Sequence, residues 1–553
     1  MEGLMQEHPL VVTGIIDYAA KFHAETGITS HTVEGPVVFH SYADIRRRAR
    51  CCALALRDLG VGPGDRVGTL AWNTHRHVEA WYGIMGLGAV CHTINPRLFA
   101  KDIAYIADHG GAGVLLAEQS FAPLIAAVAA QCPRLHTVVY LSDASISPAP
   151  PPIPRITTLN YESLLLGASP REPSFAWTRV PESAACGLCY TSGTTGLPKG
   201  VLYSHRSNYL HAMVVVQPDS LRLSSDSTIL AVVPMFHANS WGIAFAAPLT
   251  GAHLVLPGPW LGGSDVAQLL ADTRSTHTAG VPTVWLGLQQ HLQASGQRLP
   301  DLEIMVVGGA ACPRALLQYF QDEHGCDVRQ MWGMTELSPC GSVGTPKGVD
   351  RNAPAHERTE RRCTQGRPFA LCDWRIVDDG GRELRRDGKE AGRLQVRGPA
   401  TLARYYREDA PATDADGWFD TGDVATLDAH GYMRITDRSK DVIKSGGEWI
   451  SSIQVENAAV GHPDVAEAAV IAVPHPKWNE RPLLVVVLHE GKKPNKQSIL
   501  AHVATQVAKW WVPEDVVFVA EIPHTATGKI SKLQLRQQLG GLKPGDAGPA
   551  SKL

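Results

Sequence analysis

Apolar side chains recur every three or four positions within residues 76–88. This is the spacing of the buried face of an α-helix. The recurring positions are Val78, Trp81, Tyr82 and Met85. Residues 121–131 and 265–272 have a similar pattern, so we predict helices over all three segments.

Short apolar runs lie between the predicted helices, at residues 113–116, 137–141 and 229–233. Runs of this length are typical of strands that are buried on both faces, as in parallel sheets. Their alternation with helices predicts an α/β fold, in which a large N-terminal domain contains mostly parallel sheets with helices.

The pattern changes near residue 440. A strand–turn–strand pattern precedes this point, and a compact stretch with its own strands and helices follows it. Those strands are predicted at residues 468–473, 483–488 and 516–519. We therefore predict a large domain over residues 1–439, a small mobile α+β domain over residues 440–540 and a flexible tail over residues 541–553.

Two segments with few apolar residues interrupt the large domain. Residues 147–154 are rich in proline, which is typical of an exposed connector. Residues 346–362 are polar and carry charges and prolines, so we predict a long loop there.

Composition narrows the class of protein. Hydrophobic residues make up 44% of the chain and charged residues 19%, which is typical of globular domains with large cores. The formal net charge of −3 indicates neither a nucleic-acid-binding surface nor a polybasic membrane-binding segment. The sequence contains no apolar run long enough for a transmembrane helix and no secretory signal pattern.

The cysteines and the last residues bear on the compartment. The 11 cysteines are scattered and too few for a disulfide framework, so we expect reduced thiols of an intracellular protein. Cys186 and Cys189 have CxxC spacing within an apolar run, and we interpret them as a buried structural pair. Ser551, Lys552 and Leu553 match the peroxisomal address, so we expect a peroxisomal location in a eukaryote and a cytoplasmic one in a bacterium.

The strongest local signal is the segment TSGTTGLPKG at residues 191–200, which follows a predicted strand. Its glycines let the backbone approach a ligand closely, and its hydroxyl and N–H groups can surround phosphate oxygens. It is not a Walker A loop, because the order of glycine, lysine and hydroxyl residues differs. The residues assigned to phosphate binding are Thr191, Ser192, Gly193, Thr194, Thr195, Gly196 and Lys199.

This segment resembles the phosphate loop of the adenylate-forming superfamily, which includes acyl-CoA synthetases, luciferases and the adenylation domains of peptide synthetases. The resemblance extends to about residue 535. It is nearest to medium- and long-chain fatty-acid CoA ligases and methylmercaptopropionate-CoA ligases. It implies that the protein uses ATP and Mg²⁺ to convert a carboxylic acid to its acyl-adenylate. The acyl group then passes to coenzyme A, with AMP and pyrophosphate as the other products.

The resemblance also assigns an adenine-binding region. In MWGMTE at residues 331–336, Trp332 stands where the family usually has tyrosine, and its flat face suits stacking against adenine. Gly309 and Ala310 belong to a small-residue turn that lines the adenine and acyl pockets in the family. The other cofactor contacts assigned from this motif are Gly333 and Thr335.

Metal and ribose contacts follow from the same resemblance. Glu336 is a hard oxygen ligand suited to Mg²⁺, and the residue at the place of Thr191 shares this role in the family. Asp423, in a Thr-Gly-Asp motif, is expected to accept hydrogen bonds from the ribose hydroxyls. Arg438 resembles the family's ribose and phosphate contact.

The segment DRSKDVIKSGGEWI at residues 437–450 is the second strong signal. Lys440 has the position of the family's hinge residue, at a domain junction where few residues absorb a rotation. Gly446 and Gly447 would let the pantetheine arm of coenzyme A pass close to the backbone. Trp449 is assigned to the same cofactor-binding segment.

Lys529 has the position of the family's adenylation lysine. Its ammonium would neutralise charge that develops between the carboxylate and the α-phosphate. The resemblance implies that the small domain turns at Lys440 between the two half-reactions and so withdraws Lys529. The residues assigned to catalysis are Lys529, His237 and Glu336.

The segment PMFHANSW at residues 234–241 resembles the family's acyl-binding segment. Phe236 and Trp241 are assigned to the substrate, and Trp241 aligns with the residue that gates the acyl tunnel in fatty-acid ligases. His237 would lie near the reacting carboxylate. Amino-acid-activating domains have aspartate there, which disfavours an amino acid. Other candidate lining residues are apolar or small: Ala244, Phe245 and Val281.

Several alternatives stay open at this point. A medium-chain fatty acid is the first choice, followed by a long-chain fatty acid or 3-methylmercaptopropionate, and then another short or aromatic acid. Adenylation followed by transfer to a carrier protein, or by oxidation, is a second enzyme interpretation. A non-catalytic nucleotide- or acyl-CoA-binding protein is disfavoured because Lys529, Glu336 and Asp423 are all present. Since members of the superfamily are often dimers, a homodimer is also expected.

Overall fold

The computed structural model describes residues 3–142, 152–191, 197–438, 441–445, 448–525 and 529–539. Most of the proline-rich connector and all of the predicted tail lie outside these residues. The side chains at positions 351, 444, 448 and 449 also lie outside the description.

A nine-stranded sheet forms the centre of the large part, in the order β16-β15-β14-β13-β12-β10-β11-β1-β2. Its central strands pair in parallel, and β2, β15 and β16 add antiparallel edges. The bounds are β1 Gly27–His31, β2 Val37–Ser41, β10 Thr228–Ala231, β11 His253–Leu256, β12 His277–Gly280, β13 Ile304–Gly308, β14 Asp327–Gly333, β15 Cys340–Val343 and β16 Arg367–Pro368.

A seven-stranded sheet lies beside it, in the order β7-β6-β5-β3-β4-β8-β9. All its pairs are parallel except β8–β9. The bounds are β3 Arg66–Leu70, β4 Val90–Thr93, β5 Val114–Ala117, β6 Thr137–Tyr140, β7 Thr157–Asn160, β8 Ala185–Tyr190 and β9 Gly200–Ser204. The two sheets confirm the predicted α/β layers.

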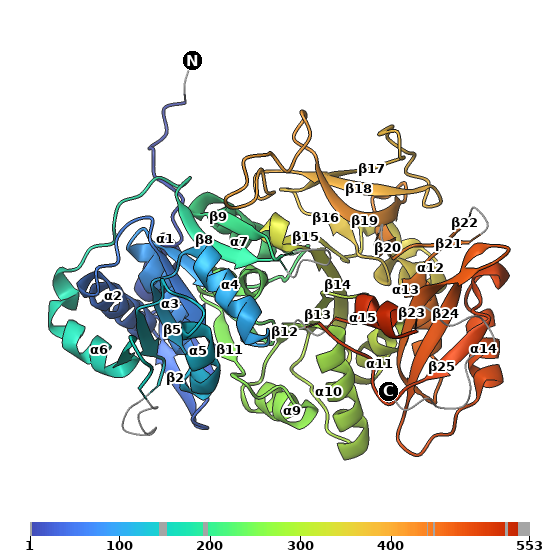
Figure 1. Cartoon of the computed structure of the whole chain (residues 1–553), viewed down its shortest axis with the longest axis horizontal. Coiled ribbons are helices and arrows are strands. Elements are labelled where there is room, and N and C mark those ends of the chain that lie inside the picture. Colours follow the sequence, from blue (N-terminus) through green and yellow to red (C-terminus); the bar gives the residue numbers. More distant parts are fainter. Residues whose placement is uncertain are drawn as a thin grey trace.

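Twelve α-helices accompany these sheets in the described part of residues 3–438 (Figure 1). Every residue of α3 is buried, because this helix lies in the largest hydrophobic core together with α2. The bounds are α1 Thr13–Phe22, α2 Tyr42–Asp58, α3 His75–Gly86, α4 Ala100–Gly110, α5 Ala122–Ala129, α6 Tyr161–Ala168, α7 His205–Val215, α8 Ile243–Thr250, α9 Gly263–Asp272, α10 Pro282–Ser295, α11 Arg314–His324 and α12 Ala355–Arg362. Short 3₁₀ helices are η1 Gln119–Phe121 and η2 Ser169–Ser174.

The predicted long loop at residues 346–362 is wrong. The structure has a 3₁₀ helix, η5 (Gly348–Asn352), followed by α12. None of the α12 residues is buried, so no apolar periodicity reveals this helix in the sequence. Ion pairs stabilise it instead: Arg361 contacts Glu357 one turn earlier at 3.3 Å, which is a favourable spacing on a helix.

A third sheet departs from the parallel pattern. Its four strands, in the order β17-β18-β19-β20, are all antiparallel. The bounds are β17 Asp373–Val377, β18 Ala391–Arg397, β19 Phe419–Leu427 and β20 Met433–Arg438. This sheet is orange in Figure 1 and shares a hydrophobic cluster with residues of the other two sheets, among them Tyr203 of β9 and Trp332 of β14.

The C-terminal unit has a five-stranded sheet. Its described buried apolar residues form two hydrophobic clusters that have no residue in common. Its strands are β21 Ile443–Ser445, β22 Glu448–Ile450, β23 Val465–His475, β24 Asn479–Leu488 and β25 Asp515–Phe518. Its helices are α13 Ser452–Val460, α14 Lys496–Ala504, η6 Lys509–Trp511 and α15 Lys532–Leu539. This α+β composition matches the prediction, and the unit lies at one end of the molecule (Figure 1).

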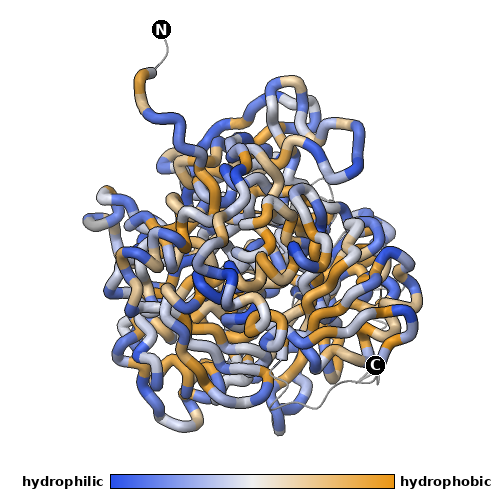
Figure 2. The backbone as a smooth tube through the Cα atoms, turned by 90° about the vertical axis from the view of Figure 1, so that its left-hand side faces the viewer, coloured by the Kyte–Doolittle hydropathy of each residue, from blue (hydrophilic) through white to orange (hydrophobic). Residues whose placement is uncertain are grey.

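Burial follows the hydropathy pattern. In Figure 2 the hydrophilic segments gather on peripheral loops, while hydrophobic segments run through the interior. Cys186 and Cys189 are buried, and all eleven cysteines are free, as predicted. Among the described residues, no helix combines the length and the apolar character needed to cross a membrane.

Candidate active site

One cavity of about 610 Å³ is lined by residues from both parts of the chain. Its polar lining from the large part includes Thr191, His237, Glu336 and Arg438, and the C-terminal unit contributes Thr525 and Lys529. A smaller cavity of about 110 Å³ shares part of this wall. Gly309, Gly333, Arg438 and Lys529 line both. Residues predicted to contact ATP therefore lie around two adjoining spaces.

The sheet topology explains this convergence. His237 follows β10, Gly309 follows β13, and Gly333 ends β14. These strands belong to the parallel part of one sheet, so the segments that follow them reach the same edge. Ligands of open α/β sheets bind at this carboxyl edge.

Lys529 of the C-terminal unit is held by two hydrogen bonds to Thr525. Its backbone N–H donates to Thr525 Oγ1 at 3.2 Å, and its carbonyl accepts from Thr525 N–H at 2.6 Å. Burial and then the charge of Arg438 lower the pKa of Lys529 to about 8, against the opposing effect of Asp423 and Glu336. The amine therefore lies in the combined field of Arg438 and two carboxylates.

Glu336 lies in the 3₁₀ helix η4 (Thr335–Leu337) at the cavity wall. Tyr405 donates its hydroxyl to Glu336 Oε1 at 2.8 Å, and Tyr203 donates to the carbonyl of Thr335 at 2.7 Å. Burial raises the pKa of Glu336. Two tyrosines thus fix this turn, and the carboxyl group faces a space that Thr191 also lines.

The donors present suit Mg²⁺. Within the described ranges, no group of three or more His, Cys, Asp or Glu side chains is placed to hold a metal ion by itself. Mg²⁺ typically binds one or two carboxylates together with water and substrate phosphates. Glu336 and the hydroxyl of Thr191, both at the wall of the larger cavity, are hard oxygen donors of that kind.

Trp332, Asp423 and Arg438 form one connected group. Trp332 donates its indole N–H to Asp423 Oδ2 at 2.9 Å, and Arg438 Nε contacts Asp423 Oδ1 at 2.8 Å. Trp332 and Asp423 are buried, and all three line the smaller cavity together with Ala310. A direct hydrogen bond thus joins the ring predicted to stack on adenine and the carboxylate predicted to bind ribose.

His237 is a neutral side chain in this environment. Burial and then the nearby charge of Lys529 lower its pKa to about 4. It lines the larger cavity, so the structure brings it together with Lys529 as predicted from the sequence. At neutral pH the imidazole can donate and accept hydrogen bonds but carries no charge.

The segment after His237 has an unusual backbone. Ala238, Asn239, Ser240 and Trp241 all have positive φ, between 45° and 52°. They form η3 (Ala238–Gly242), a left-handed turn. Such a conformation costs about 1–2 kcal/mol per non-glycine residue, and strain of this kind is often found at functional sites.

Buried hydrogen bonds hold this left-handed turn. Asn239 donates to the side-chain oxygen of Asn208 at 2.9 Å, and Ser240 donates to the carbonyl of Val233 at 3.1 Å. Trp241 lines the cavity, and its ring lies 2.7 Å from the position that a β-carbon on Gly308 would take. Glycine at 308 therefore makes room for the indole.

The other predicted acyl-site residues divide into two groups. Val281 lines the cavity. Phe236 is buried beside Trp72, at 6.1 Å between ring centroids, and is not among the lining residues. Ala244 and Phe245 are buried in the main core.

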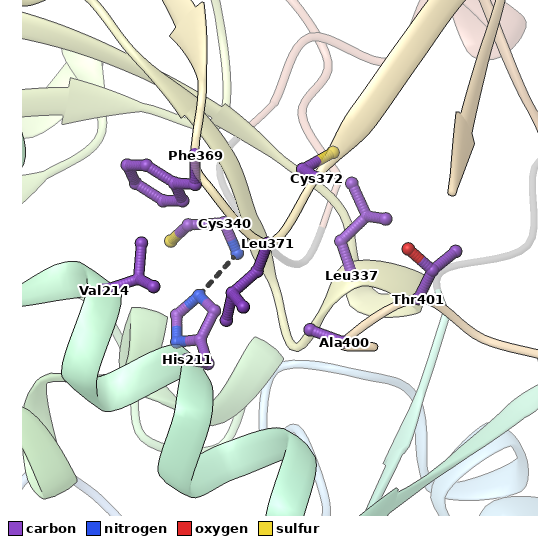
Figure 3. Close-up of a pocket in the computed structure, with 9 residues that line it drawn as sticks. All are labelled: His211, Val214, Leu337, Cys340, Phe369, Leu371, Cys372, Ala400 and Thr401. Atoms are coloured by element: carbon purple, nitrogen blue, oxygen red, sulfur yellow. Dashed lines mark hydrogen bonds between the residues drawn. The ribbon is translucent and has the colours of Figure 1, made fainter. Parts of the chain in front are cut away.

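A further, small void of about 10 Å³ has a mainly apolar lining (Figure 3). Cys340 lines both this void and the cavity. His211 of α7 accepts a hydrogen bond from the Cys340 backbone N–H at 3.0 Å, as the dashed line in Figure 3 shows. The apolar side chains around the void are Val214, Leu337, Phe369 and Leu371.

The two ends of the predicted phosphate loop, Thr191 and Lys199, are hydrogen-bonded to each other. Thr191 N–H donates to the carbonyl of Lys199 at 2.9 Å, and the Lys199 ammonium lies 4.8 Å from the ring centre of Tyr405. The rest of the predicted loop (Ser192, Gly193, Thr194, Thr195 and Gly196) lies outside the described residues. The same holds for Lys440, Gly446, Gly447 and the Trp449 side chain.

Tyr405 is a further residue of the site that was not predicted from the sequence. Its hydroxyl contacts Glu336 and its ring faces Lys199, so it connects the predicted metal ligand to the phosphate loop. The adjacent aromatic pair of Tyr405 and Tyr406 has no helical or strand periodicity that would have singled it out.

Known proteins resemble the chain over nearly its whole length. Residues 20–406 match the AMP-binding enzyme family, and residues 454–529 match the AMP-binding enzyme C-terminal domain. The predicted boundary at residues 439–440 falls between these matches and stays a prediction.

The proteins similar to the chain include two CoA ligases and one solved structure. The 3-methylmercaptopropionyl-CoA ligase of Ruegeria lacuscaerulensis is 45% identical, over 97% of this chain and 99% of its own length. The medium-chain-fatty-acid–CoA ligase of Ectopseudomonas oleovorans is 42% identical over 98% of each. The crystal structure of an anthranilate CoA ligase with anthranoyl-AMP has a TM-score of 0.85 at 26% identity, covering 97% of this chain and 99% of its own. The chain therefore belongs to the AMP-binding enzyme family, which confirms the resemblance seen in its motifs and the predicted class of enzyme.

Proposed function

We propose that the protein is an AMP-forming ligase that activates a medium-chain fatty acid as its acyl-adenylate and then forms the acyl-CoA thioester. The observation that carries this proposal is the cavity shared by Lys529 of the C-terminal unit and Glu336 and Arg438 of the large part. Adenylate formation joins two anions, a carboxylate and the α-phosphate. Two cationic side chains fixed at that cavity supply the field that stabilises such a transition state.

Each side chain then has a distinct role. Lys529 would neutralise charge between the carboxylate and the α-phosphate, and His237 would orient the carboxylate through a hydrogen bond. Asp423 would bind the ribose hydroxyls within a group already ordered by Trp332 and Arg438. Mg²⁺ held by Glu336 and Thr191 would supply further positive charge to the phosphates.

The proposed acid follows from the lining of the cavity. The wall near His237 is largely apolar and includes Val233, Ala238, Trp241 and Val281, which suits an alkyl chain. A neutral His237 provides no anion to pair with the ammonium of an amino acid. The names of the two relatives support a medium-chain fatty acid and, as a second candidate, 3-methylmercaptopropionate.

We also propose that the C-terminal unit turns at Lys440 between the half-reactions. This rotation would bring Gly446 and Gly447 beside the pantetheine arm that carries the coenzyme A thiol. Support comes from the position of Lys529. It lies on the C-terminal unit, yet it lines a cavity formed mainly by the large part. A side chain held in this way can be withdrawn only with the unit that carries it.

A homodimer is proposed as well. Val37 and Phe39 on the edge strand β2 are each 53% exposed, and an exposed apolar edge strand is a pairing surface. Light scattering should give twice the chain mass of 59.6 kDa, and Phe39→Lys should give the monomer. A monomeric wild-type protein would refute this part.

The enzymatic proposal is tested with saturated acids from propionate to palmitate and with 3-methylmercaptopropionate. We expect pyrophosphate release with ATP and acid, and acyl-CoA only when CoA is added, with the highest kcat/KM at medium chain length. Lys529→Ala should lower adenylation by about 10²–10³-fold, the typical effect of removing one preorganised electrostatic group. A folded wild-type protein that forms no AMP with any of these acids would refute the function, and a preference for 3-methylmercaptopropionate would replace the proposed acid.

A further inference from the structure

A buried group of charged and polar side chains connects the large part to the C-terminal unit. We define the junction cluster as Asp437, Ser452, Glu456 and Lys532. Asp437 lies in β20, the last strand before residues 439–440, whereas the other members lie after them, in α13 and α15. The cluster therefore spans the position at which the C-terminal unit is proposed to turn.

One arm of the junction cluster crosses between the two parts. Asp437 Oδ2 accepts hydrogen bonds from the backbone N–H of Ser452 at 2.9 Å and from its hydroxyl at 2.6 Å. The neighbouring Ser451 hydroxyl also donates to the carbonyl of Thr436 in β20. Asp437, Ser451 and Ser452 are almost completely buried. Hydrogen bonds to a buried carboxylate are strong and costly to break.

The second arm connects α13 to the segment that carries Lys529. The Lys532 ammonium contacts Glu456 Oε1 at 2.8 Å and also donates to the Ser452 hydroxyl. Each side chain of the Lys532–Glu456 pair is 13% exposed. Burial lowers the pKa of Lys532, but the charges of Glu456 and Asp437 outweigh it and raise the pKa overall. Lys532 is therefore charged and fixed.

Lys532 lies three positions after Lys529, at the start of α15. The two lysines have different surroundings: Lys529 lines the cavity, while Lys532 contacts α13. Along the chain of contacts, β20 holds Ser452, Ser452 and Glu456 hold Lys532, and Lys532 fixes the base of the segment that presents Lys529.

We propose that the junction cluster, with Lys532 as its central residue, positions Lys529 for adenylation and opens when the C-terminal unit turns for thioester formation. Lys532 is thus a positioning residue, which acts through Lys529 and touches no substrate. This inference rests on the proposed function. It adds a residue whose loss should affect one half-reaction and spare the other, because the bonds to Asp437 are present in the arrangement that places Lys529 in the cavity and would break as the C-terminal unit turns.

The test measures the two half-reactions separately in the full-length protein. Adenylation is followed by ATP–pyrophosphate exchange with octanoate and no CoA. Thioester formation is followed from synthetic octanoyl-adenylate and CoA. Lys532→Gln should lower the exchange rate by about 10- to 100-fold, since displacing a reacting group by about 1 Å can cost 10²-fold. The rate from octanoyl-adenylate should stay within about threefold of wild type.

A second variant tests the arm that crosses the junction. Asp437→Asn keeps the size and one acceptor oxygen but removes the charge that holds Ser452. It should slow exchange and leave thioester formation unchanged or faster. Glu456→Gln combined with Lys532→Gln replaces the ion pair with a neutral pair and should recover part of the exchange activity lost in Lys532→Gln alone.

Lys496→Gln is the matched control. Lys496 contacts Asp515 at 2.6 Å within the C-terminal unit, and it lies outside the junction cluster, so both half-reactions should keep wild-type rates. Equal loss of both half-reactions in Lys532→Gln and Asp437→Asn, or no loss in either, would overturn the inference. A wild-type protein inactive in both assays with every acid would instead refute the proposed function.

Discussion

Trp332 donates its indole N–H to Asp423 Oδ2 at 2.9 Å inside the wall of the smaller cavity. The other carboxylate oxygen of Asp423 contacts Arg438 at 2.8 Å. The orientation of Asp423 is thus fixed by two donors. A tryptophan at position 332 gives this chain a hydrogen-bond donor in addition to a flat ring.

Trp332→Phe should weaken both folding and ATP binding. The change leaves a buried oxygen of Asp423 without its donor, at an expected cost of about 1–3 kcal/mol. We expect a lower unfolding free energy in urea and a several-fold higher KM for ATP, with kcat for adenylation largely retained. Trp374→Phe is the control, since this buried indole lies 6.5 Å from Trp332 between ring centroids and is not among the cavity-lining residues. An unchanged KM in Trp332→Phe would contradict the role of this hydrogen bond.

Adenylation should lose activity as the pH rises through about 8. The pKa of Lys529 is lowered from 10.5 to about 8, so the free enzyme loses the ammonium above that pH. The kcat/KM for ATP reports ionisations of the free enzyme. Above pH 8 its decrease should approach tenfold for each pH unit. By linkage, Lys529 lowers the free energy of unfolding, and this destabilisation is fully present below pH 8. It diminishes as the pH rises from about 8 to 10.5, the pKa of the unfolded lysine.

Lys529→Arg tests whether the ionisation of Lys529 causes the loss of adenylation activity near pH 8. A guanidinium stays protonated throughout the accessible pH range, so the variant should be slower but should lack the loss of activity near pH 8. If the variant keeps the same alkaline limb as wild type, another group is responsible for it.

Gly309→Ala should damage the site more than the fold. Gly309 has φ +80°, and a β-carbon there would lie 3.2 Å from Val281 Cγ1 and 3.7 Å from Lys529 Cε. The left-handed backbone alone costs about 1–2 kcal/mol with alanine. The added methyl group would also crowd Val281 in the cavity wall and come into contact with Lys529 Cε. Adenylation should therefore fall by at least about tenfold, as small displacements of reacting groups are expensive.

Gly296→Ala provides the comparison for this variant. Gly296 has φ +70°, and a β-carbon there would meet no atom within 4 Å. The melting temperature of the Gly296→Ala variant should fall as in Gly309→Ala, while its rate of ATP–pyrophosphate exchange should match that of the wild type. Equal exchange rates in the two variants would show that the space beside Lys529 is not limiting.

The sequence predicted the features that depend on local pattern. The buried strands of the two parallel sheets have continuous apolar runs, and α3 has a clear helical spacing. Of the antiparallel sheet of β17 to β20, only the strand–turn–strand pattern before residue 440 was predicted, and the surface helix α12 was not predicted. Helix α12 depends on ion pairs such as Arg361 with Glu357, which leave no hydrophobic period in the chain.

The candidate site was predicted where motifs resemble those of the family. The structure brings Lys529, His237, Glu336 and Arg438 to one cavity, and their individual roles remain predictions. The left-handed turn at Ala238–Gly242 was not predictable, because four of its five residues are not glycine and such residues rarely adopt positive φ. Long-range contacts fix that conformation, and single-sequence patterns do not encode them.

The wall at Cys340 should limit the length of the acyl chain. Cys340 lines both the cavity and the apolar void near Phe369 and Leu371, and its sulfur lies 3.8 Å from the carbonyl oxygen of Trp241. Cys340→Ala should connect the two spaces and favour a fatty acid that is longer by one or two methylene groups. Each additional buried methylene is worth about 0.8 kcal/mol, or about fourfold in kcat/KM.

The measurement is the ratio of kcat/KM for successive saturated acids in wild type and variant. Cys326→Ala is the matched control, because Cys326 is also buried but belongs to a different hydrophobic cluster. That variant should lose some stability and keep the wild-type order of acids. If Cys340→Ala remains folded and also keeps the wild-type order of acids, the acyl chain does not extend toward Cys340. Another part of the cavity wall then limits the length of the acyl chain, and Trp241 on its strained turn is the next residue to test.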